Sequence, residues 1–125
     1  MKRIIQTTNA PAAIGPYSQA VEVGGTLYVS GQIPLDPAIL KVVEGGIQEQ
    51  TIQVLKNIGA ILKEAGYEYK NVVKTTCFLS DMANFKAMNE VYSTIFSDSP
   101  PARSTFAVKE LPLGVLIEIE TIAVK

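Results

Sequence analysis

The sequence has 125 residues, of which 47% are hydrophobic and 18% charged, so we expect one folded domain over residues 1–125. The formal net charge of −1, without any block of lysines or arginines, argues against a broad electrostatic surface for nucleic acid. The chain has no histidine, which excludes nucleophile pairs of serine or cysteine with histidine, and histidine-bound zinc.

Cys77 is the single cysteine, so no disulfide can form within the chain. Its apolar neighbours and the lack of a basic partner favour a place in the core. No secretory hydrophobic segment is evident, and no apolar run approaches the roughly 20 residues that span a bilayer. We therefore expect a cytoplasmic protein, with an organellar matrix as the alternative compartment.

The amino-terminal third predicts short strands around a loop. Residues 3–7 have the composition of an edge strand, and the prolines within residues 8–19 exclude a helix or a central strand. Residues 20–35 place apolar runs on both sides of Gly24 and Gly25, which is typical of a β-hairpin.

The middle of the chain predicts a helix, a strand and a second helix. Apolar residues repeat at helical spacing over 47–65, and Gly66 lies where a left-handed C-terminal cap belongs. Residues 71–80 are typical of a strand. A second helix, capped by a polar residue at its start, is predicted over 81–97.

The last quarter predicts a second hairpin, in which strand 103–108 pairs with strand 115–124. The order of elements favours an α+β fold with two helices packed on one face of a sheet. Because strands 71–80 and 115–124 are apolar on both faces, a monomer would leave much of the second face in water. We infer that another copy covers this face, as a closed ring or dimer; the alternative is a sheet that curls and closes on itself.

Arg103 is the first candidate for chemistry. Pro101 fixes its own φ and pushes Pro100 toward an extended conformation, so the backbone just before Arg103 has little conformational freedom. A guanidinium held in this way is suited to a bidentate grip on a carboxylate. The alternative is an arginine at the rim of the molecule, paired with a surface Asp or Glu.

Two glutamates interrupt the apolar carboxy-terminal strand. A buried carboxylate is costly without a partner, so Glu118 and Glu120 require an explanation. If the last two strands pair with residue 103 opposite residue 120, then Arg103, Thr105 and both glutamates share one face. The alternative is that the glutamates line a solvent-exposed face.

Asn89 lies within the apolar stripe of the second predicted helix, where an amide normally has a specific partner. The alternative is a bond to the backbone that positions the helix. Tyr17 and Ser30 border glycine-containing turns and are ordinary loop residues on composition alone. No phosphate loop, dinucleotide fingerprint or metal-ligand cluster is present.

Several segments together resemble the RidA/YjgF family of reactive-imine deaminases, from about Ile5 to Lys125. These segments are NAPAAIGPYSQA, VSGQIPL, EQTIQVLKNIGAILKEAG, MNEVY, PPARSTFAVKELPLG and IEIETIAVK. The resemblance implies a chorismate-mutase-like α+β fold with a mixed sheet, and a homotrimer with its sites in the clefts between subunits. It also implies hydrolysis of 2-aminoacrylate, 2-aminocrotonate and related imines to 2-oxo acids and ammonia, without a metal or cofactor.

The resemblance also implies roles for single residues. Arg103 corresponds to the family's essential arginine, and Glu118 to the carboxylate that works with a water molecule. The remaining pocket positions correspond to Tyr17, Ser30, Gly31 and Asn89. Many members have a cysteine where this chain has Thr105, so a thiol nucleophile is not available there.

The family resemblance carries two alternative functions. One is that of an endoribonuclease or translation inhibitor, against which the missing histidine and the acidic net charge argue. The other is a non-catalytic regulatory trimer that binds small carboxylates.

Overall fold

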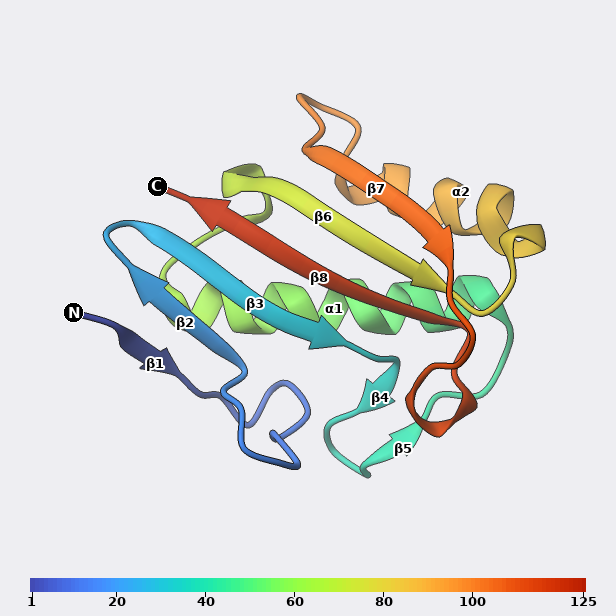
Figure 1. Ribbon diagram of the computed structural model, residues 1–125, viewed down its shortest axis with the longest axis horizontal. Coiled ribbons are helices and arrows are strands. Elements are labelled where there is room, and N and C mark those ends of the chain that lie inside the picture. Colours follow the sequence, from blue (N-terminus) through green and yellow to red (C-terminus); the bar gives the residue numbers. More distant parts are fainter.

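The computed structural model describes residues 1–125 and contains a six-stranded sheet with two helices on one face (Figure 1). The sheet is built from β1 (Arg3–Ile5), β2 (Ala20–Val23), β3 (Thr26–Gln32), β6 (Val72–Leu79), β7 (Ala102–Ala107) and β8 (Ile117–Val124). The helices are α1 (Ile47–Ala65) and α2 (Phe85–Ile95). The short hairpin of β4 (Leu35–Asp36) and β5 (Lys41–Val42), which the sequence did not predict, lies apart from the sheet.

The amino-terminal hairpin and the first helix confirm the predictions. Gly24 and Gly25 have φ values of 54° and 81°, so the turn between β2 and β3 uses the left-handed conformations that suit a tight hairpin. Gly66 follows α1 with φ of 84°, and its N–H bonds the carbonyls of Leu62 and Lys63 as a helix C-cap.

The predicted pairing of the last two strands is wrong. The strand order is β1-β2-β3-β8-β6-β7, so β8 lies between β3 and β6, while β7 pairs with β6 in parallel. The burial of the two strands is consistent with this order. In β8, buried residues such as Ile117 and Ile119 alternate with partly or fully exposed residues, whereas no residue of β7 is buried. A half-polar strand is better placed at the edge, and α2 supplies the connection that parallel pairing requires.

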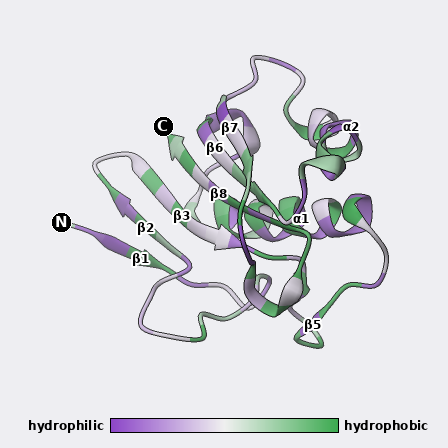
Figure 2. Cartoon of the chain, turned by 45° about the vertical axis from the view of Figure 1, so that its right-hand side comes forward, coloured by the Kyte–Doolittle hydropathy of each residue, from purple (hydrophilic) through white to green (hydrophobic).

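The hydrophobic core fills the space between the sheet and the two helices. Leu27, Ile58 and Ile119 have no exposed surface there. Figure 2 shows apolar residues along both the strands and the helices. Cys77 is also fully buried, as predicted, and burial raises the pKa of its thiol to about 11.

A β-bulge changes which valine of β6 enters the core. The register between β6 and β8 shifts between Val72 and Lys74, so Val72 is buried and Val73 is 46% exposed. Regular alternation along strand 71–80 predicts that Val73 shares a face with Cys77. This prediction is wrong, because an inserted residue reverses the side-chain alternation beyond it.

The second face of the sheet carries no helix and faces the viewer in Figure 1. Apolar side chains remain about half exposed on it, among them Tyr28, Phe106 and Val124. The sheet has two free edges, β1 and β7, so it does not curl and close on itself. No helix of the chain is both long enough and apolar enough to cross a membrane.

Candidate active site

Arg103 is held on the helix side of the edge strand β7. Its Nη1 donates a 2.7 Å hydrogen bond to Oδ1 of Asn89 on α2. Its Cζ lies 4.7 Å from the ring centroid of Tyr92 and 5.5 Å from that of Phe85. A cation close to two aromatic rings is stabilised by their quadrupoles, so three side chains of one helix fix the guanidinium.

The spacing of α2 explains why these three side chains meet Arg103. Phe85, Asn89 and Tyr92 are separated by four and three residues, and therefore lie along one face of the helix. That face packs against the sheet, where the parallel register places Arg103 directly beside Thr75 of β6. The alternative interpretation of Asn89, a bond to the backbone, is wrong, because its partner is the guanidinium.

Arg103 has no acidic partner within the chain. The two ion pairs of the structure join Arg3 to Glu22 and Lys70 to Glu68. The alternative of a rim arginine paired with a surface carboxylate is therefore wrong. Because the bond to Asn89 is the only hydrogen bond of this side chain, the other N–H groups of the guanidinium have no protein acceptor.

Thr105 lies two residues beyond Arg103 on the same face of β7, beside Cys77 of β6. Its Oγ1 is buried and has no hydrogen-bond partner. A buried hydroxyl without a partner is uncommon, since it loses its bonds to water without replacement. Thr105 therefore shares a face of β7 with Arg103, with its hydroxyl turned into the protein.

Glu118 and Glu120 lie on the opposite face of the sheet from Arg103. They alternate along β8 with Ile117 and Ile119, which point into the core beneath the helices. The prediction that the arginine and the glutamates share a face is wrong, because it assumed that β7 and β8 are neighbours. In the actual order β6 separates these strands, and the helix-facing side chain of β7 is Arg103.

The Glu118 carboxylate lies against Gly31 of β3. A Cβ at position 31 would collide with the carboxylate, so glycine is required for this approach. Partial burial, with a further contribution from the charge of Glu120, raises the pKa of Glu118 above its usual range. A carboxyl group with a raised pKa can exchange protons closer to neutral pH than an ordinary glutamate.

Ser30 and Gly31 lie in a bulge of β3, next to the loop that carries Tyr17. The register of β3 and β8 shifts between Val29 and Gln32, which leaves Ser30 and Gly31 in the irregular stretch. The Ser30 hydroxyl donates to the carbonyl oxygen of Ser18 at 2.6 Å. Tyr17, the neighbour of Ser18, is 51% exposed.

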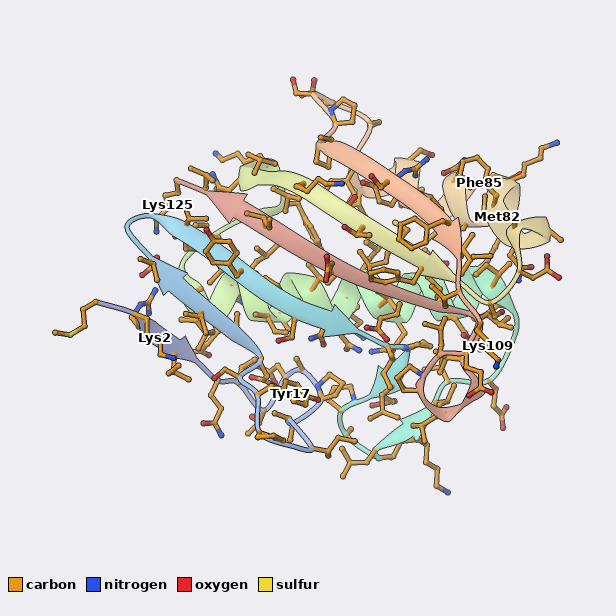
Figure 3. The ribbon with its side chains drawn as sticks, viewed as in Figure 1. Lys2, Tyr17, Met82, Phe85, Lys109 and Lys125 are labelled. Atoms are coloured by element: carbon orange, nitrogen blue, oxygen red, sulfur yellow. The ribbon has the colours of Figure 1, made fainter.

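The predicted site residues, together with the two aromatic residues that contact Arg103, fall into two groups within one chain. The arginine half-site comprises Phe85, Asn89, Tyr92, Arg103 and Thr105. The glutamate half-site comprises Tyr17, Ser30, Gly31 and Glu118. Figure 3 shows how far apart they lie: Phe85 is next to the edge strand β7, whereas Tyr17 is in the loop near the opposite edge.

Phe85 and Tyr92 belong to the apolar stripe of the second predicted helix, and the sequence indicates no role for them at the site. Their spacing from Asn89 placed them on the same helix face, which is the signal that could have found them. No cluster of three or more acidic or cysteine side chains is arranged to hold a metal ion.

Comparisons with known proteins agree with this architecture. The family model described as Endoribonuclease L-PSP matches residues 7–125. The 2-iminobutanoate/2-iminopropanoate deaminase of Mus musculus is 54% identical over 125 residues, which is all of this chain and 93% of the mouse protein.

Two solved structures show the same fold. RidA from an Antarctic Psychrobacter superimposes with a TM-score of 0.95 at 44% identity, over 98% of this chain and 99% of that one. Escherichia coli TdcF with bound serine superimposes with a TM-score of 0.94 at 40% identity, over 98% of each chain. The chain belongs to the Endoribonuclease L-PSP family, also called the RidA/YjgF family, and the predicted α+β fold is confirmed.

Proposed function

We propose that this protein is a deaminase that hydrolyses reactive 2-imino acids, and their enamine forms 2-aminoacrylate and 2-aminocrotonate, to 2-oxo acids and ammonia. The observation that carries the proposal is Arg103, a cation oriented by Asn89 and two rings yet left without a carboxylate of its own chain. The full-length similarity to a mouse imine deaminase supports the same chemistry.

Arg103 binds the carboxylate of the substrate in this proposal. The free edge of the guanidinium can donate two parallel charge-assisted hydrogen bonds, each worth about 1.5–3 kcal/mol. Fixing the acid end of a small substrate determines where its imine carbon lies. Orientation of an electrophile that is already reactive can supply much of the acceleration. Thr105, on the same face of β7, contacts the substrate beside the guanidinium through its backbone in this proposal, because its hydroxyl oxygen is buried.

A second copy of the chain completes the site in this proposal. Arg103 and Glu118 lie on opposite faces of one sheet, so a single chain does not present both to one small molecule. The exposed apolar side chains of the open face supply a surface for association. We propose a homotrimer in which each cleft pairs the arginine half-site of one subunit with the glutamate half-site of the next.

The proposed reaction adds water to the imine carbon. Glu118 orients the water and accepts one of its protons as the oxygen attacks, which forms a tetrahedral carbinolamine. The carboxyl group gives this proton to the nitrogen. It then accepts the proton of the carbinolamine hydroxyl and passes it to the nitrogen as the C–N bond breaks, so that the carbonyl forms and ammonia leaves. No covalent intermediate is required, which fits Thr105 at a position where a cysteine is frequent in the family. As part of the proposal, the reaction takes place in the cytoplasm and uses neither metal nor cofactor.

The experiment generates the imine with a pyridoxal-phosphate-dependent threonine dehydratase and follows its decay optically. We expect the protein to accelerate the decay, Arg103→Ala to abolish this effect without loss of fold, and Arg103→Lys to reduce it because the two-pronged grip is lost. Arg3→Ala is the matched control, since Arg3 is paired with Glu22 and belongs to neither half-site. Wild-type rates in Arg103→Ala, or no acceleration by the native protein, would refute the proposal.

The same preparations test the two alternatives. RNA cleavage by highly purified protein that disappears in Arg103→Ala would favour the endoribonuclease function that the family description suggests. Saturable binding of 2-oxo acids without turnover would favour a non-catalytic carboxylate-binding protein.

A further inference from the structure

We propose that Tyr92 and Thr75 act as a pair of positioning residues that hold the Arg103 guanidinium in the orientation in which it binds a carboxylate. The inference rests on the proposed function, because it explains how the carboxylate-binding side chain is aimed. Neither residue is expected to contact the substrate.

The pair is a buried hydrogen bond between a helix and the sheet. The Tyr92 hydroxyl and Thr75 Oγ1 are 2.7 Å apart, and either oxygen can be the donor. Thr75 is fully buried and Tyr92 is 6% exposed, so water does not compete for the bond. Burial also raises the pKa of Tyr92, which keeps its hydroxyl protonated and able to donate.

The bond fixes the ring against which Arg103 rests. Thr75 lies directly beside Arg103 in the parallel register of β6 and β7. The tyrosine is therefore tied at its hydroxyl end to the strand beside the arginine, and its ring lies 4.7 Å from the guanidinium carbon. A ring fixed at its far end cannot swing, so the surface that supports the cation stays in place.

Three contacts together restrict the orientation of the guanidinium. Tyr92 and Phe85 flank it, and the bond to Asn89 occupies one edge. The remaining edge is then free for two parallel bonds to a carboxylate. Phenylalanine at position 92 and valine at position 75 would fill the same space as the native side chains. The two hydroxyl groups therefore contribute a hydrogen bond that orients the Tyr92 ring, and they are not needed to fill the core.

Arginine side-chain NMR tests the inference without any substrate. The chain has two arginines, Arg3 and Arg103, so isotope-labelled protein gives two guanidinium signals that Arg3→Lys assigns. We expect Arg103 to be rigid in the native protein and mobile on the ps–ns timescale in Tyr92→Phe and in Thr75→Val. The Arg3 signal, held by Glu22 and the Ala65 carbonyl, is the internal reference.

A binding measurement shows whether this mobility matters. Titration with 2-oxobutanoate, a stable carboxylate of the product class, should show about three- to tenfold weaker binding in either single variant. In the dehydratase-coupled assay KM should rise more than kcat falls, since the lost orientation acts through carboxylate binding. The double variant Thr75→Val/Tyr92→Phe should regain stability, because no unpaired hydroxyl remains, but not affinity.

Thr121→Val is the matched control. Thr121 lies beside Thr75 on β8, is buried, and has a hydroxyl without any partner, so its removal should leave the Arg103 signal and the affinity unchanged. A rigid Arg103 and native affinity in Tyr92→Phe, or equal loosening in Thr121→Val, would overturn the inference. If native protein neither binds 2-oxobutanoate nor hydrolyses imines, the proposed function fails, and the NMR result still decides whether the pair positions Arg103.

Discussion

At the scale of single residues, the site depends on a cation that has no partner of opposite charge. Asn89 holds Arg103 through a neutral amide oxygen at 2.7 Å. A carboxylate in its place would neutralise the cation and compete with the substrate for it. The chain therefore orients the guanidinium with uncharged groups and leaves its charge unpaired, as the proposed binding of a substrate carboxylate requires.

Exchange of this amide for an acid tests the argument. Asn89→Asp should lower kcat/KM about 10- to 100-fold, because an internal ion pair occupies the guanidinium, while the free energy of unfolding should not fall. The measurements are steady-state kinetics and chemical denaturation. Asn71→Asp is the control, since Asn71 also accepts a bond through Oδ1 but caps a distant turn. An active Asn89→Asp variant would contradict the role given to Arg103.

The raised pKa of Glu118 predicts two effects of pH. In the proposed reaction Glu118 acts as a base and must be ionised, so activity should rise with pH through a pKa above the usual range for glutamate. The folded state binds this proton more tightly than the unfolded state, so the contribution of Glu118 to stability falls as pH rises through the same interval. Glu118→Gln should abolish activity and flatten stability in that interval, as pH-dependent kinetics and denaturation would show. An unchanged pH–stability profile in Glu118→Gln would contradict the assignment.

At the scale of elements, the bulge in β3 and the central strand β8 support each other. Gly31 leaves room for the Glu118 carboxylate, which a Cβ would strike. Parallel pairing of β6 and β7 places Thr75 beside Arg103, and the face of α2 supplies the groups around the guanidinium. The positions of both half-sites thus follow from pairing between strands far apart in sequence.

Gly31→Ala tests the contact between β3 and β8. We expect it to impair catalysis, because the added methyl displaces the Glu118 carboxylate, and to destabilise the fold by about 0.5–1.5 kcal/mol, the cost of forcing that side chain from its rotamer. The destabilisation should largely disappear in the background of Glu118→Ala, which thermal denaturation measures as a coupling. Gly24→Ala is the control: its strain at φ of 54° should cost about 1 kcal/mol without affecting activity. Independent effects of Gly31→Ala and Glu118→Ala would refute the contact.

The sequence was a better guide to elements than to their neighbours. Helical spacing and the glycine at 66 located α1 well, because these signals are local. The same local patterns could not show that α2 connects two parallel strands and that β8 inserts between β3 and β6. Arg103 and Asn89 were identified from their setting in the chain, but the face that each occupies depends on this long-range pairing.

At the scale of the whole molecule, the uncovered face of the sheet and the separation of the half-sites have one common explanation. Tyr28, Phe106 and Val124 are each about half exposed on a face without helices. A neighbouring copy would cover such side chains and could bring Glu118 to Arg103. Stability, assembly and activity should therefore fail together when this face is made polar.

The assembly can be tested by placing a charge on the open face. We expect native protein to sediment as three chains of 13.5 kDa, and Tyr28→Asp to dissociate it with loss of activity, because a buried charge opposes association. Ile52→Asp is the control, since Ile52 is 55% exposed on α1 on the other side of the molecule. A monomeric native protein that remains active would contradict the trimer.

The central claim, that two chains build each site, is tested most directly by complementation between two inactive variants. Arg103→Ala and Glu118→Gln carry different affinity tags, are co-expressed, and are purified through both tags in succession. If the half-sites meet between subunits, every trimer that contains both variants has one site of three with both native residues, so we expect about one third of the native activity. Activity that stays at the level of either variant alone, in oligomers shown to contain both chains, would contradict the account.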